Sequence, residues 1–151
     1  MMATMKPLPG AARGYWRARL AAQAVGALIL AALVTDSAEV ELGPFLLVAV
    51  LLAVVAVVVV PAVRWRRWAY EIRDEEIELR HGTFVARRTL VPIRRVQHVD
   101  SEQGPLQGSF GLAAVTFHTA AGKVSIPALG VSEADRVRRR VAELARTLDD
   151  V

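Results

Sequence analysis

Three histidines and an aspartate are the side chains whose types and spacing could support catalysis or metal binding. His98 and Asp100 lie two residues apart, and in a strand this spacing places both side chains on one face, where they could work as a general acid–base pair. His81, His98 and His118 could supply imidazole nitrogens to a metal ion. Neither set has the local spacing of a known metal or hydrolase motif.

Other signatures of catalysis are absent from the sequence. The chain has no phosphate-binding Gly-Lys-Ser/Thr loop, no nucleophile elbow and no pair of histidines one helical turn apart. It also has no cysteine, which excludes a disulfide framework and a thiolate metal site. We therefore predict no catalytic residue, no cofactor and no bound metal, with a small enzyme acting through His98 and Asp100 as an alternative.

Seven arginines form the candidate contact surface for anionic lipid. Each basic residue held near an anionic membrane surface contributes about 1 kcal/mol of binding. The alternative for the arginines of the polar half is a solvated or ion-paired face, because exposed ion pairs contribute little. Three of the seven follow the longest apolar run and four fall further along the chain: Arg64, Arg66, Arg67, Arg87, Arg88, Arg94 and Arg95.

The elements that position these residues begin with two uncharged apolar runs. Residues 42–63 carry no charge and are long enough to cross a hydrocarbon core of about 30 Å as a helix. Residues 20–35 form a shorter uncharged run. A cleaved secretory signal is not expected there, because no Ala-x-Ala site follows Leu30 and the second span comes next. The sequence thus predicts a transmembrane helical hairpin, placed at residues 18–67.

The charges that flank the hairpin predict its orientation in a cell membrane. Lys and Arg residues lie outside both spans, whereas the link between them carries only Asp36, Glu39 and Glu41. The positive-inside rule therefore makes residues 1–17 a cytoplasmic N-terminal segment and residues 68–151 a cytoplasmic domain. The net charge is +4, and the positions of the basic residues beside the apolar spans favour a membrane over nucleic acid. We therefore predict no nucleic-acid partner.

The polar half of the chain changes to a two-residue repeat, which indicates half-buried strands. Apolar and charged residues alternate in two short runs on either side of a turn at Asp74-Glu75. The sequence Ser132-Glu133-Ala134-Asp135 has the form of a capping box and predicts one final amphipathic helix. Further strands are expected at residues 83–91, 96–102, 115–119 and 123–126.

The stretch QGPLQGSFGL, residues 103–112, combines three glycines with a proline. The glycines at about 1 kcal/mol each and Pro105 at about 3 kcal/mol would cost a helix interior roughly 6 kcal/mol relative to alanine. We therefore expect a non-helical loop between two strands. The predicted fold class is α+β: a two-helix transmembrane hairpin followed by an antiparallel β partial barrel that a C-terminal helix caps.

The motifs RRVQHV, QGPLQGSFGL and FHTAAG, with the order of the elements, resemble the bacterial pleckstrin-homology-like family (bacterial PH family 2) of small membrane proteins with two N-terminal transmembrane helices. The resemblance implies a PH-like barrel in which the glycine-rich piece connects successive strands. The family commonly has a basic residue at the position of Gly108, so the resemblance does not extend to anion binding by this loop. Residues 74–76 are acidic, whereas phosphoinositide-binding relatives have basic residues at this turn. This difference argues against a phosphoinositide as the ligand.

The function predicted from this reading is that of a nonenzymatic protein-binding or scaffolding module at the inner membrane. The alternatives are a module that binds anionic lipid headgroups and the small enzyme considered above. Besides the lipid bilayer, the expected partner is an unknown membrane or cytoplasmic protein. The resemblance makes a larger PH-like membrane relative a natural candidate, and a homo-oligomer is the other arrangement left open.

Overall fold

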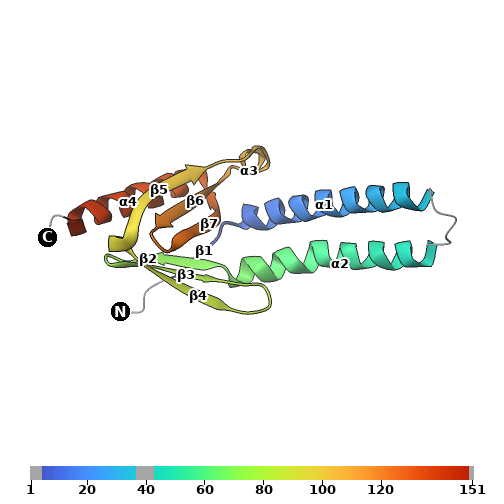
Figure 1. Cartoon of the computed structure of the whole chain (residues 1–151), viewed down its shortest axis with the longest axis horizontal. Helices are drawn as coiled ribbons and strands as arrows, with labels where there is room; N and C mark the ends of the chain where they lie inside the picture. Colours follow the sequence, from blue (N-terminus) through green and yellow to red (C-terminus); the bar gives the residue numbers. More distant parts are fainter. Residues whose placement is uncertain (1–4, 37–42, 150–151) are drawn as a thin grey trace.

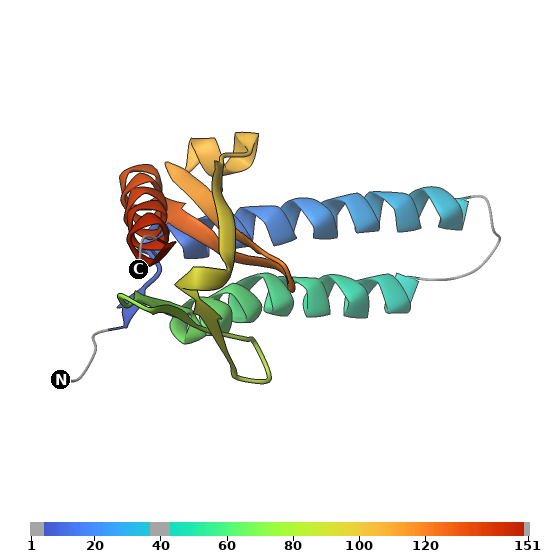
Figure 2. The ribbon, with the colours of Figure 1, turned by 60° about the vertical axis from the view of Figure 1, so that its left-hand side comes forward.

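The computed structural model describes residues 5–36 and 43–149 and consists of two long helices joined to a small α+β domain (Figure 1). The helices α1 (Gly10–Asp36) and α2 (Gly43–Arg67) lie side by side in both views (Figures 1 and 2). Both are long and apolar enough to cross a membrane, and only 6% of each apolar window is buried. Exposing so many Leu and Val side chains to water would be unfavourable, so these helices are suited to a lipid environment. The two-helix hairpin of the predicted fold class is confirmed.

The domain contains two antiparallel sheets that do not close into a barrel. The first sheet has the strand order β1-β2-β3-β4, and the second has the order β5-β6-β7. The predicted partial barrel with a C-terminal helix is confirmed, because α4 (Val131–Asp149) packs against the second sheet and the link that precedes it. The strands and the short link are β1 (Lys6–Pro7), β2 (Ala69–Ile72), β3 (Glu76–His81), β4 (Arg87–Pro92), η1 (Ile93–Arg95), β5 (Val96–Glu102), β6 (Leu112–Thr119) and β7 (Gly122–Gly130).

The first turns of α1 belong to the core of the domain. Tyr15 and Trp16 are buried in the same cluster as Phe117 of β6 and Val141 of α4. The Trp65 indole, near the end of α2, donates hydrogen bonds to the carbonyls of Leu8 and Pro9 at 3.0 and 3.1 Å. The helices and the domain therefore form one packed unit. This packing explains why α1 begins at Gly10, well before the expected start of the hairpin at residue 18.

Several strands differ from the sequence expectation: β6 and β7 are longer than the expected residues 115–119 and 123–126, and β4 and β1 differ more clearly. The strand expected over residues 83–91 begins only at Arg87, because the preceding residues form the tip of the β3–β4 hairpin. Gly82 has φ +129°, a backbone conformation that ends the ladder and starts this tip. Strand β1 was not expected at all, since two residues carry no periodicity; Lys6 and Pro7 pair with Tyr70 and Ala69 of β2.

The expectation that QGPLQGSFGL is wholly non-helical is wrong, because α3 (Pro105–Ser109) forms one short helix within it. Pro105 stands at the first helical position, where its missing N–H removes no hydrogen bond. Gly111 lies beyond the helix at φ +63°, so the helix contains one glycine, Gly108. The Gln107 side chain also accepts a 2.9 Å hydrogen bond from the Gly104 N–H. The summed helix penalty therefore does not apply.

Candidate functional site

The three juxtamembrane arginines differ in their contacts. The Arg64 guanidinium lies 4.5 Å from the centre of the Trp16 ring, a cation–π contact that joins α2 to α1. Arg67 Nη1 donates to the backbone carbonyls of Thr83 and Phe84 at 2.9 and 3.2 Å. Arg66 is exposed. The C-terminal end of α2 therefore contacts both α1, through Arg64, and the β3–β4 hairpin, through Arg67.

The four other arginines do not join this group as one site. Arg87 lies opposite His81 in the β3–β4 register, and His81 stacks on Trp68 directly after α2. Pro92, at the other end of β4, lies opposite Glu76. Arg94 and Arg95 follow Pro92 in η1, so they lie at the end of the sheet away from α2. Of the four, Arg87 and Arg88 lie at the end of β4 nearest α2, whereas Arg94 and Arg95 do not.

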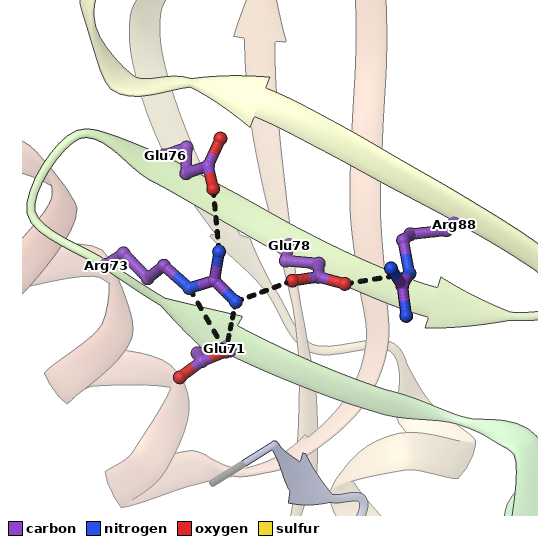
Figure 3. A network of polar contacts seen from close by, with 5 residues as sticks. All are labelled: Glu71, Arg73, Glu76, Glu78 and Arg88. Carbon is purple, nitrogen blue, oxygen red and sulfur yellow. Dashed lines mark hydrogen bonds and ion pairs between the residues drawn. The ribbon is translucent and has the colours of Figure 1, made fainter. Parts of the chain in front are cut away.

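Arg88 is engaged in an ion-pair network across the first sheet (Figure 3). Its Nε lies 2.9 Å from Glu78, a carboxylate that is only 5% exposed. The Arg73 guanidinium contacts Glu71 at 3.0 Å and both Glu76 and Glu78 at 2.8 Å. Because each buried carboxylate oxygen of Glu78 has a cationic partner, the network satisfies a charge that would otherwise be costly to bury. Arg88 therefore has a structural partner within the sheet.

His98, Asp100 and His118 come together on the outer face of the second sheet. His98 lies opposite His118 in the β5–β6 register, and their rings stack with centroids 4.0 Å apart and planes 16° apart. Asp100 Oδ2 lies 2.9 Å from His118 Nε2 and 3.6 Å from His98 Nε2. A metal ion bound by both histidines would have to lie near both ring planes, which nearly parallel rings do not share. The three side chains form a cluster in which the two imidazole rings stack and Asp100 lies within ion-pair distance of both.

His81 is separate from that cluster and belongs to the first sheet. Its ring stacks on Trp68 at a centroid distance of 5.4 Å, and Nε2 lies 3.3 Å from Thr89 Oγ1. Burial, with the charges of Arg87 and Arg64, lowers the pKa of His81. The three histidines considered as metal ligands are therefore not brought together, whereas the His98–Asp100 pair is, with His118 added.

Glu133, near the start of α4, is the centre of a polar cluster that the sequence pattern did not reveal. Tyr70 donates to it at 2.9 Å, Lys6 lies 3.4 Å away, and Arg136 forms a further ion pair. These residues line a cavity of about 370 Å³ between β2 and α4. Burial opposes ionisation of Glu133, but the Tyr70 hydrogen bond and the charges of Lys6 and Arg136 outweigh it and lower the pKa of Glu133. Burial, with the bond to Glu133, raises the pKa of Tyr70.

The lowered pKa of Glu133 predicts a pH-dependent contribution to stability. A carboxylate whose pKa is lower in the folded state stabilises the fold above its unfolded-state pKa, near 4.5, and loses this contribution as the pH falls through the folded value. Glu133→Gln should therefore show a smaller drop in unfolding temperature between neutral pH and about pH 3 than the wild type does. Glu143→Gln, on the exposed face of α4, should retain the wild-type drop. Parallel drops in all three proteins would contradict this assignment.

The outer edge of β4 is the remaining candidate surface. Within the described residues β4 pairs with β3 alone, so its other edge has no strand partner. A groove of about 240 Å³ runs between this edge and the β6–β7 hairpin, and Leu90, Pro92 and Val124 are among its lining residues. Leu90 is 52% exposed. An unpaired edge beside apolar side chains is the arrangement to which an extended peptide can add as a further strand.

Comparisons with known proteins agree with this architecture. A family model described as "Bacterial PH domain" matches residues 20–145. The chain is 48% identical over 98 residues to the UPF0699 transmembrane protein YdbS of Bacillus subtilis (strain 168), covering 65% of this chain and 62% of that protein. It is 31% identical over 83 residues to the UPF0699 transmembrane protein YdbT of the same organism, covering 52% of this chain and 17% of that protein. The matches thus span less than two thirds of either relative. No solved structure gives a significant match.

Proposed function

Since the chain belongs to the bacterial PH domain family and is a membrane protein, we propose that it is a nonenzymatic module that binds another protein at the inner membrane. The observation that carries this proposal is the edge of β4 that pairs with no strand in the described part of the chain, beside the groove that Leu90 lines. Pairing with β4 would supply main-chain hydrogen bonds, and the groove would receive alternate side chains of the added strand. The occupant is an extended segment of a partner protein.

The anchoring of the domain limits which partners can reach this edge. Because α1 and the domain share one core, β4 is held in a constant position relative to the two membrane helices. A segment close to the membrane surface is therefore favoured over a freely diffusing one. Our candidate partner is a larger membrane relative that carries a domain of the same kind. YdbT is an example of such a relative, because the region that matches this chain makes up only 17% of its length.

We further propose that the domain faces the cytoplasm, with both termini on that side. The support is the placement of Lys and Arg outside both spans and of acidic residues alone between them. In this arrangement residues 1–17 and 68–151 are cytoplasmic and residues 18–67 form the anchor. Ser125→Cys introduces a single cysteine, because the sequence has no other. This cysteine should react with a membrane-impermeant thiol reagent only after the membrane has been permeabilised, so that the reagent reaches the cytoplasmic face.

Leu90→Lys is expected to prevent the partner from binding at β4. A photoreactive amino acid at Arg95, which lines the same groove, should give a discrete crosslinked species in native membranes, and Leu90→Lys should reduce its yield several-fold. The change places a charge where an apolar side chain of the groove would be covered, and it leaves the fold intact because Leu90 is half exposed. Val131→Lys, at a second exposed apolar position, is the matched control. Equal yields in both variants would reject the β4 edge as the binding surface.

Contact with anionic lipid is a second candidate function, favoured by the basic residues at the α2 end. Arg66 and Arg87 are exposed and form no ion pair with any other described residue. Each would contribute about 1 kcal/mol if held at an anionic surface, and salt would weaken the contact. Arg94 and Arg95 are exposed as well, but they lie at the other end of the sheet and are not part of this proposal.

A further inference from the structure

The tip of the β3–β4 hairpin exposes two adjacent apolar side chains. Phe84 is 87% exposed and Val85 is 69% exposed. Among the large hydrophobic residues that the structure describes, Phe84 is the most exposed, more so than Leu47 of α2 at 73%. Single exposed apolar residues are common on protein surfaces, but this neighbouring pair at a projecting tip is left largely uncovered by the rest of the described chain.

The tip is held beside the end of α2 by contacts on both of its sides. Arg67 binds the carbonyls of Thr83 and Phe84, and His81 stacks on Trp68. Within the tip, the backbone folds so tightly that a Cβ on Gly82 would lie 1.9 Å from the Val85 carbonyl oxygen. In both views the β3–β4 loop extends past the domain end of α2, in the direction of the two long helices (Figures 1 and 2).

The length of α2 indicates how deep this tip reaches. Val63 is the last residue of the uncharged run, and Arg67 follows four residues later. When Val63 is taken as the boundary of the hydrocarbon core, a rise of 1.5 Å per residue places Arg67 about 6 Å beyond that boundary along the helix axis. The headgroup layer on each side of a bilayer is about 5–8 Å thick. The carbonyls bound by Arg67 are therefore at headgroup level, and the tip extends from there toward the acyl chains.

The charges around the tip fit the same location. From His81 to Leu90 the sequence HGTFVARRTL contains no acidic residue. The acidic residues Asp74, Glu75 and Glu76 are at the opposite end of β3, away from α2. An apolar pair with basic and uncharged neighbours is the composition found at membrane interfaces. The tip of the hairpin is therefore apolar and basic, as expected for a segment near a bilayer, whereas the end that points away from α2 is acidic.

We propose that Phe84 and Val85 insert into the headgroup–acyl boundary of the bilayer that holds α1 and α2. The occupant of this surface is phospholipid, and the insertion depends on apolar contact rather than on anionic headgroups. It places the domain against the membrane at a second point besides the helical hairpin. The inference rests on the membrane location of the helices and does not require protein binding at β4. It shares the α2 end with the lipid contact proposed above.

Site-directed spin labelling of the full chain tests the insertion, because the protein has no native cysteine. Val85→Cys carries the label at the tip, and Glu75→Cys, at the opposite end of β3, is the matched aqueous control. In nanodiscs of phosphatidylcholine, the tip label should show a several-fold higher ratio of oxygen to nickel-chelate accessibility than the control. The same ratio is expected when phosphatidylglycerol is added.

An aqueous ratio at position 85 in both lipid mixtures would overturn the insertion. Immersion that occurs only with phosphatidylglycerol would also overturn it, because the contact would then depend on headgroup charge. That second result would leave the anionic-lipid proposal standing, so the two proposals fail separately. Neither result bears on binding at β4.

Discussion

Replacing Phe117 by alanine should lower the free energy of unfolding of the domain by about 3–5 kcal/mol. Phe117 is fully buried in β6, the central strand of the second sheet, opposite Val99 of β5 and Val124 of β7. Truncation would remove its contacts with both neighbouring strands and leave a cavity that two sheets and a helix cannot easily fill. The unfolding temperature, followed by near-UV circular dichroism in detergent, should drop by more than about 12 °C for a domain of this size.

Phe84→Ala is the matched control for this prediction, because it makes the same chemical change at a site that is 87% exposed. Its unfolding temperature in detergent should stay within about 2 °C of the wild-type value, since surface substitutions of this kind change stability little. No drop in Phe117→Ala would contradict the core position of Phe117, and a large drop in Phe84→Ala would contradict the exposed position of Phe84.

Gly82→Ala is expected to disrupt the tip of the β3–β4 hairpin. Gly82 has φ +129°, where an L-residue costs of order 1–3 kcal/mol, and the added Cβ would lie 1.9 Å from the Val85 carbonyl oxygen. The backbone of the tip must therefore move, which should break the hydrogen bonds that Arg67 donates to it. Hydrogen exchange followed by mass spectrometry should show faster amide exchange over residues 80–88, and a spin label at position 85 should lose its immersion.

Gly130→Ala is the control for this backbone effect. Gly130 has no positive φ, and its added Cβ would meet nothing within 4 Å. Its amides and those of the β3–β4 hairpin should exchange as in the wild type. Unchanged exchange over residues 80–88 in Gly82→Ala would show that the tip does not depend on the glycine conformation.

The elements that were predictable from the sequence are those with a long or regular pattern. The uncharged run of residues 42–63 corresponds to α2, and the capping-box sequence at Ser132 lies at the start of α4. The penalty assigned to QGPLQGSFGL was wrong because it summed residues without their positions: a proline at the first helical position and a glycine after the last one cost little. Strand β1 is too short to leave any pattern.

The candidate sites were predictable only in part. A spacing of two residues was enough to place His98 and Asp100 on one face, but His118 joins them through the β5–β6 register. The seven arginines are close in sequence, yet the length of β4 separates Arg87 from Arg94 and Arg95. Lys6 and Glu133 are 127 residues apart, and no local signal relates them.

The sequence by itself determined that the chain has two membrane-length apolar helices, an alternating β region and a final amphipathic helix. These properties follow from local hydrophobicity and periodicity, which require no knowledge of distant contacts. Only the tertiary structure decided that α1 enters the domain core, that one edge of β4 has no strand partner among the described residues, and that Phe84 projects beside α2. These features depend on strand register and on packing between residues far apart in the chain, where the burial of apolar surface is determined by the whole fold.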